Sequence, residues 1–328
     1  MKLIFVFDRE RIKMENENRN PFMGMVDVGQ AELILNRFMR DHPQNARETE
    51  ELLDTLLEAL ATAEQLVGDS DDFHNFSVSI SRVTSDNQKT LGIVKAGLNI
   101  YPQNTDLLAD AIKYGYSCGE RKECKQWYQT LTQIDKSRWT WRAFSFSIDY
   151  LLEEWTSSNQ ADYSIEDIMR LAKEYQRQIP DEEDAWICEF DIYDSINQKE
   201  KGIQVLKDAI EKFRFCPRCW LRYADILMDR GEFEEAEPII KKMCKNPKSI
   251  EKINASYMYF LDGQCKLQKL YNSEAYDNDE VEEKDVRAVY NAFKRALSAR
   301  GLRESVKSQI DEYVAALSSE TGIEFEDE

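Results

Sequence analysis

The sequence predicts an all-α protein built from repeated pairs of helices. The 328-residue chain contains only 12 Gly and 7 Pro, which argues against a protein rich in tight turns. Apolar residues recur at helical spacing, as in Leu53, Leu56 and Leu60, so they fall on one stripe of a helix. Some segments also resemble one another at an interval of 34 residues. Similarity at a fixed interval of this length is typical of a helical-repeat protein.

The first residues differ from the rest of the chain. An apolar stretch at residues 3–7 is followed by a polar run at 15–21. We therefore expect residues 1–24 to be an N-terminal arm, either without regular structure or forming a lone strand. We expect the helical repeats to occupy residues 25–318, and the acidic residues 319–328 to be a tail.

Prolines indicate where helices end. Pro43, Pro102 and Pro180 each follow one amphipathic run and precede another. Because a proline disfavours helical backbone at the preceding residue, each of these positions predicts a break between two helices. Residues 76–80 alternate between apolar and polar, and only there does a strand remain an alternative.

The repeat is clearest around two tryptophans, Trp186 and Trp220, which are 34 residues apart. Ala224, Gly231 and Ala236 follow Trp220 at the fourth, eleventh and sixteenth positions. This pattern resembles the tetratricopeptide repeat family, whose unit is a pair of antiparallel helices. The resemblance implies a right-handed superhelical solenoid of such pairs, with the clearest repeats at 183–216 and 217–250.

Weaker repeats flank these two. They cover residues 31–45, 90–135 and 138–182, and Trp141 opens a helix 45 residues before Trp186. The excess over 34 predicts an insertion at 157–162. Beyond residue 250 we expect helices at 250–269, 283–299 and 304–318, interrupted by an acidic loop at 277–283.

The charge of the chain limits its partners. It has 43 Lys and Arg against 62 Asp and Glu, a net charge of −19. A chain this acidic repels polyanions, which argues against direct binding to nucleic acid or to an anionic membrane. The seven cysteines are an odd number and do not suggest a disulfide framework. No apolar run is long enough for a membrane span or signal peptide, so we expect a cytoplasmic protein.

Few residues suggest catalysis or metal binding. Cys216 and Cys219 form a CxxC motif, which could be a redox pair or half a zinc site. No second CxxC or nearby histidine accompanies it, so ordinary semi-buried thiols are favoured, although a redox or metal role stays open. Arg37 and His42 have the spacing found in some helical ribonucleases, but His42 directly precedes Pro43. The sequence therefore predicts a protein that is not an enzyme and has no metal or cofactor, with a helical nuclease as a remote alternative.

The resemblance to tetratricopeptide repeats also implies a binding face. In that family, ligand peptides contact fixed positions around the leading large residue of each first helix. Transferred to this chain, these positions give the partner-binding candidates Tyr116, Trp139, Arg142, Phe146, Asp149, Tyr150, Asp191, Asp194, Asp225, Met228 and Asp229.

Aromatic candidates precede a run of carboxylates along the chain. This combination suits a basic partner segment with an aromatic or apolar anchor, since anchor burial supplies affinity and charge complementarity supplies specificity. Trp139 and Phe146 could equally belong to the core between repeats. We expect a non-enzymatic protein-interaction scaffold or adaptor that docks such a segment in a concave groove. A peptide-responsive regulatory sensor is the alternative.

Overall fold

The computed structural model describes residues 21–22, 24–43, 45–157, 163–246, 248–249, 253–278, 280–299, 302–323 and 325. Over these residues the regular structure is helical, and the one extended pairing is an isolated parallel bridge between Asp27 and Val67. The predicted all-α fold is confirmed. Most of the predicted N-terminal arm (residues 1–20 and 23) lies outside the described residues, as do residues 324 and 326–328 of the predicted tail.

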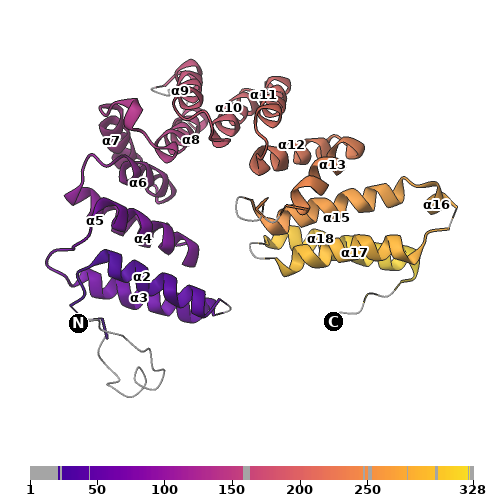
Figure 1. Ribbon diagram of the computed structural model, residues 1–328, viewed down its shortest axis with the longest axis horizontal. Coiled ribbons are helices and arrows are strands. Elements are labelled where there is room, and N and C mark those ends of the chain that lie inside the picture. Colours follow the sequence, from indigo (N-terminus) through magenta and orange to yellow (C-terminus); the bar gives the residue numbers. More distant parts are fainter. Residues whose placement is uncertain are drawn as a thin grey trace. The chain divides into compact units, whose positions relative to one another are not determined.

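The chain divides into two compact units, Met1–Ser164 and Ile165–Glu328. The first unit contains α2 (Val28–Asp41), α3 (Ala46–Ala61), α4 (Ser70–Val83), α5 (Asn87–Ile100), α6 (Thr105–Ser117), α7 (Arg121–Thr132), the short 3-10 helix η1 (Lys136–Arg138) and α8 (Trp141–Ser157). Within it, α4 packs on α5, α5 on α6 and α6 on α7, so helices that follow one another in sequence are also neighbours in space (Figure 1). This is the arrangement expected of stacked helix pairs.

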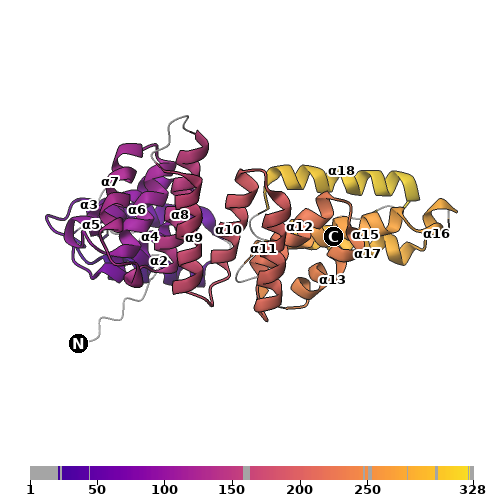
Figure 2. The same cartoon turned by 90° about the horizontal axis from the view of Figure 1, so that it is seen from above.

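The second unit contains α9 (Ile165–Gln178), α10 (Asp184–Ser195), α11 (Lys199–Lys212), α12 (Pro217–Asp229), α13 (Phe233–Cys244), α15 (Ala255–Tyr271), α16 (Glu274–Asp277), α17 (Glu283–Ser298) and α18 (Glu304–Thr321). The pairs α10 with α11, α12 with α13 and α15 with α17 pack closely. The final helix, α18, contacts α15 and α17 and lies alongside them (Figure 2).

Local sequence explains where the helices begin. Polar side chains cap several first turns: Asp27 accepts a hydrogen bond from the Gln30 amide, and Asn104 accepts one from the Leu107 amide at 2.9 Å. Such caps satisfy amide groups that have no partner inside the helix. Pro43, Pro102 and Pro180 fall between helices, so the predicted breaks at these prolines are confirmed.

The structure corrects several expected elements. Residues 76–80 lie inside α4, so the strand alternative is wrong. Phe73, Phe76 and Ile80, at steps of three and four, are the large apolar side chains that this helix buries. The helix expected at 250–269 is α15, which begins only at Ala255 because Asn254 caps it. The closing helix continues to Thr321 and ends at Gly322 with a positive φ of 70°, a conformation that favours glycine.

The two ends of the expected acidic loop are helical as well. Asp277 belongs to α16, and Glu283 opens α17. The insertion expected at 157–162 follows α8, which begins at Trp141 and ends at Ser157. Residues 158–162 lie outside the described residues. Within the described part of the chain, none of the helices combines the length and the apolar character that crossing a bilayer requires.

The core of the second unit follows the repeat pattern. Trp220 is 2% exposed and packs in one cluster with Ala224, Ala236 and Ile240. The large side chain fills the space between α12 and α13, and the two alanines allow these helices to approach. The tryptophan and the small residues at its fourth and sixteenth following positions therefore have the packing roles that the repeat implies.

Candidate functional site

The eleven partner-binding candidates fall into two sets, one in each unit. Tyr116, Trp139, Arg142, Phe146, Asp149 and Tyr150 belong to the first unit, and Asp191, Asp194, Asp225, Met228 and Asp229 to the second. We describe each set within its own unit.

Three aromatic candidates of the first unit are largely buried. Trp139, Phe146 and Tyr150 are 4%, 9% and 3% exposed. The indole Nε1 of Trp139 donates a hydrogen bond to the Ile134 carbonyl at 3.1 Å. The ring of Tyr150 packs edge-on against Tyr116 with the centroids 5.9 Å apart, and burial raises the pKa of the Tyr150 hydroxyl. These contacts favour a packing role for Trp139 and Tyr150.

Two cations of the first unit lie against aromatic rings. The Lys113 Nζ lies 4.5 Å from the centroid of the Phe146 ring, and the Arg142 guanidinium lies 4.7 Å from that of Trp141. Both distances are in the range of cation–π interactions. The pKa of the Lys113 ammonium group is lowered, mainly because burial disfavours its charged form. Trp141 is 37% exposed. The repeat pattern marks it only as the start of a helix and could not reveal it as a surface aromatic.

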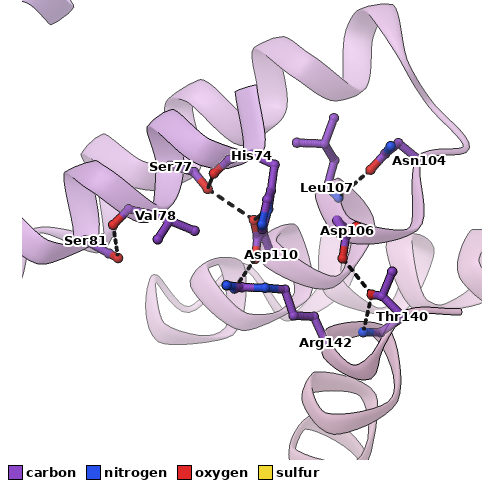
Figure 3. A network of polar contacts seen from close by, with 11 residues as sticks. His74, Ser77, Val78, Ser81, Asn104, Asp106, Leu107, Asp110, Thr140 and Arg142 are labelled. Carbon is purple, nitrogen blue, oxygen red and sulfur yellow. Dashed lines mark hydrogen bonds and ion pairs between the residues drawn. The ribbon is translucent and has the colours of Figure 1, made fainter. Parts of the chain in front are cut away.

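A buried carboxylate organises this face. Asp110 of α6 is fully buried, and its Oδ2 lies 2.7 Å from Nδ1 of His74 and accepts a hydrogen bond from the Ser77 hydroxyl at 3.1 Å. Arg142 of α8 approaches the other oxygen, Oδ1, at 3.8 Å. Figure 3 shows His74 and Arg142 pointing at Asp110 from two different helices.

These contacts link α4, α6 and α8 through one side chain. His74 and Asp110 are 36 residues apart, so their contact depends on how α4 packs near α6. The repeat positions alone could not reveal it. A second contact, from the Thr140 hydroxyl to Asp106 at 2.6 Å, fixes the start of α8 on α6 in the same region (Figure 3).

The residues considered for catalysis are engaged in other contacts. Arg37 lies 3.6 Å from Asp41 in an ion pair, and His42 stands at the end of α2 with its ring 4.6 Å from that of Phe38. Nothing in these contacts prepares His42 for proton transfer from a substrate. The nuclease alternative therefore receives no support from this geometry.

The CxxC motif lies in the core at the start of α12. Cys216 precedes the helix, Pro217 opens it, and both Cys216 and Cys219 are fully buried. A hydrogen bond with Cys216, together with burial, raises the pKa of the Cys219 thiol, and the thiolate is the reactive form of cysteine. Over the described residues, no group of His, Cys, Asp or Glu is arranged to hold a metal ion. The geometry favours structural thiols.

In the second unit, α12 presents charges of both signs on one face. Arg218, Arg222, Asp225 and Asp229 are spaced by four, three and four residues, and side chains at these steps share one side of a helix. The two cations belong to its first half and the two carboxylates to its second half. The face is therefore positive at the start of α12 and negative at its end.

Two carboxylates of α10 hold the two arginines of α12. Arg218 forms an ion pair with Asp184 of α10, whose side chain is 3% exposed, and Arg222 lies 2.9 Å from Asp191 of the same helix. Asp225 accepts a hydrogen bond from the Tyr257 hydroxyl of α15. Burial raises the pKa of both Asp191 and Asp225. These two candidates already have donors within the unit.

Two further carboxylate candidates of the second unit, Asp194 and Asp229, remain open to a partner. Asp194 and Asp229 are exposed, and no ion pair joins either of them to another described residue. Met228 is half-buried and packs against the hydrophobic core of the unit. Asp149 of the first unit is also exposed.

A hollow of about 460 Å³ lies beside the face of α12. Residues from four places line it: α10, α12, the start of α15 and the start of α18. The candidates transferred from the repeat include Asp225 of this lining, but not Tyr257 or Arg303. Those two residues come from helices beyond the recognisable repeats, so a repeat pattern could not have found them.

Known structures identify the fold. A scan against protein-family models and a sequence search of curated proteins both give no match. A tetratricopeptide repeat protein from Parabacteroides merdae matches with a TM-score of 0.50 and 14% identity, covering 87% of this chain and 99% of that one. Yeast Tom70 matches with a TM-score of 0.59 and 12% identity over 90% of this chain. The match covers 60% of the Tom70 chain.

A structure of human IFIT1 with PPP-AAAA also matches, with 12% identity over 96% of this chain and 67% of that one. Its TM-score is 0.42, which is too low for an argument about ligands. At these identities the matches concern the fold alone. The chain has the tetratricopeptide-like helical-repeat fold that its sequence resembles.

Proposed function

We propose that this chain is a non-enzymatic scaffold or adaptor that docks a segment of another protein. The observation that carries the proposal is the combination of the charged face of α12 with the adjoining hollow of about 460 Å³. Helical-repeat folds present such faces for binding rather than for chemistry. Ile187 and Leu221 line the hollow beside the charged side chains, so it offers both apolar contact and charge.

The exposed carboxylates support a partner with a basic residue. Asp194 and Asp229 are exposed and have no ion pair with another described residue, so a Lys or Arg of the partner gains a contact without displacing an existing one. An apolar side chain of the same segment would bury against Ile187 and Leu221, and such burial supplies most of the affinity at a typical interface. The net charge of −19 favours a protein partner over a nucleic acid, and we propose a cytoplasmic location.

Charge reversal tests this function. The full chain carrying Asp194→Lys and Asp229→Lys is compared with wild type as bait in affinity purification. A matched control carries Glu234→Lys and Glu235→Lys, two exposed residues in the first turn of α13, and has the same total change in charge. We expect a stoichiometric protein partner whose recovery falls about tenfold or more with the first variant and is unchanged with the control. Equal recovery with both variants would remove Asp194 and Asp229 from the docking face.

A further inference from the structure

The hollow in the second unit is lined by more cations than carboxylates. Arg218, Arg222 and Arg303 line it, and Asp225 is the carboxylate among the lining residues. Arg218 and Arg222 form ion pairs with Asp184 and Asp191 of α10. A guanidinium has five N–H donors, so a single ion pair leaves donors available for a ligand. Arg303 is exposed and forms no ion pair with another described residue.

Asp225 is a weak competitor for these arginines. Its carboxylate accepts a hydrogen bond from the Tyr257 hydroxyl, so part of its hydrogen-bonding capacity is already used. Burial also raises its pKa, and this effect outweighs the nearby charge of Arg222. The single carboxylate of the lining is thus already occupied by a neutral donor from α15.

The start of α18 favours an anion independently of the arginines. This 18-residue helix begins after Arg303, and no side chain caps its first turn. Ser305 and Val306 of that turn line the hollow. The Val306 amide donates to the Arg303 carbonyl at 3.0 Å, and Glu304 also belongs to this turn. The amides that precede Val306 have no partner within the helix, and the helix dipole adds partial positive charge at this end. Two unrelated features, guanidinium groups and an uncapped helix start, therefore meet in one hollow.

The spacing along α12 relates this hollow to the exposed carboxylate. Arg222 and Asp229 are seven residues apart on one face, about 10 Å along the axis at about 1.5 Å per residue. A peptide in the polyproline II conformation rises about 3.1 Å per residue and points every third side chain to the same side. Two of its side chains that reach these two points are therefore about three residues apart.

We propose that the docked segment carries an anionic group, a carboxylate or a phosphate, which binds in the hollow between Arg222, Arg303 and the start of α18. The basic residue of the same segment then lies over Asp229, about three positions away in a peptide of polyproline II conformation. This inference rests on the proposed docking function and specifies its partner. Arg222 precedes Asp229 along α12. The anionic residue of the segment therefore lies toward the start of that helix, and the basic residue lies toward its end.

A selection from a random-peptide display library tests the inference. The bait is the full-length chain, as wild type, as Arg303→Glu, or as the control Arg214→Glu. Arg214 is likewise exposed, and it does not line the hollow. With wild type and the control, we expect selected peptides to combine Asp or Glu with Lys or Arg about three positions apart. With Arg303→Glu, the enrichment of Asp and Glu should disappear while that of Lys and Arg persists.

The outcomes separate this inference from the docking function. If wild type selects no peptides, the proposed docking itself fails. If it selects basic peptides without an acidic residue, or if Arg303→Glu selects the same peptides as wild type, only the anionic subsite is wrong. These results require no partner to be known beforehand.

Binding measurements on a synthetic copy of a selected peptide show which anionic group the hollow prefers. Replacing its acidic residue with Gln should weaken binding about tenfold or more, because a hydrogen bond between two charged groups is lost. Replacing it with phosphoserine should strengthen binding if the hollow fits a phosphate, and should weaken it if the hollow fits a carboxylate. Equal binding of the acidic and Gln peptides would contradict the inference.

Discussion

At the scale of single residues, burial decides which charges can take part in binding. Asp110 and Asp184 are buried and serve to position arginines on neighbouring helices. Asp194 and Asp229 are exposed and so remain available to a partner. All four are aspartates on helices of the same acidic sequence, so net charge alone could not separate the structural carboxylates from those that we propose bind a partner.

Removing the buried carboxylate of the first unit should be costly. We expect Asp110→Ala to lower the free energy of unfolding by about 3 kcal/mol, because His74, Ser77 and Arg142 lose their shared acceptor. Ser77→Ala removes one donor only and should cost about 1 kcal/mol. Urea unfolding followed by tryptophan fluorescence measures both. Equal losses for the two variants would show that Asp110 does not hold the three helices together.

Burial of Asp225 should make stability depend on pH. The pKa of its carboxyl is raised in the folded state, whereas an Asp in an unfolded chain titrates near about 3.9. The folded state therefore binds more protons between these two values, and its stability falls as pH rises through that range. Asp225→Asn removes this cost and keeps an acceptor for Tyr257.

Relative to wild type, Asp225→Asn should therefore become more stable as pH is raised from about 4 to about 7. Urea unfolding at a series of pH values checks this. A difference for Asp225→Asn that shrinks as pH rises would contradict the assigned direction of the shift.

At the scale of helices, glycines and alanines set how closely neighbours pack. Gly97 of α5 is buried where a Cβ would lie 2.9 Å from Phe73 of α4 and 3.0 Å from Leu107 of α6. Gly92, on the same helix, has no atom within 4 Å of its would-be Cβ. The two positions separate packing from helix propensity within a single helix.

The same substitution should have opposite effects at these two glycines. Gly97→Ala should destabilise the protein by about 1–3 kcal/mol, because Phe73 and Leu107 would have to move. Gly92→Ala should stabilise it by about 0.5–1 kcal/mol, because alanine favours the helix. Thermal or urea unfolding gives the sign of each. A stabilising Gly97→Ala would mean that α5 does not pack this closely on its neighbours.

Sequence predicted helices best where local signals agreed. The prolines located three breaks, and the residues around Trp220 showed which side chains pack between α12 and α13. The strand alternative at 76–80 failed because five alternating residues also fit a helix whose large buried apolar side chains are Phe73, Phe76 and Ile80. The capping role of Asn254 was missed, which placed the start of α15 several residues too early.

The site was harder to predict than the fold because its contacts join distant residues. Repeat positions indicated Asp191 and Asp225, but they could not show that Arg222 and Tyr257 already engage these carboxylates. Arg303 comes from the last helix, where no repeat is recognisable. Each of these contacts depends on tertiary packing, which a periodic pattern does not contain.

At the scale of the whole molecule, two compact units each stack helices in sequence order. Within the second unit, α10 and α12 carry the candidate carboxylates, whereas their packing partners α11 and α13 do not. This division gives the proposed docking face a definite location. It predicts which helices a bound partner protects from solvent and which it leaves unchanged.

Hydrogen exchange with and without the captured partner would show this location directly. We expect protection to increase in Asp184–Ser195, in Pro217–Asp229 and at the start of α18, because the docked segment covers these elements. Exchange in Lys199–Lys212 and Phe233–Cys244 should stay the same. Protection confined to α11 and α13, with α10 and α12 unchanged, would contradict the proposed docking face.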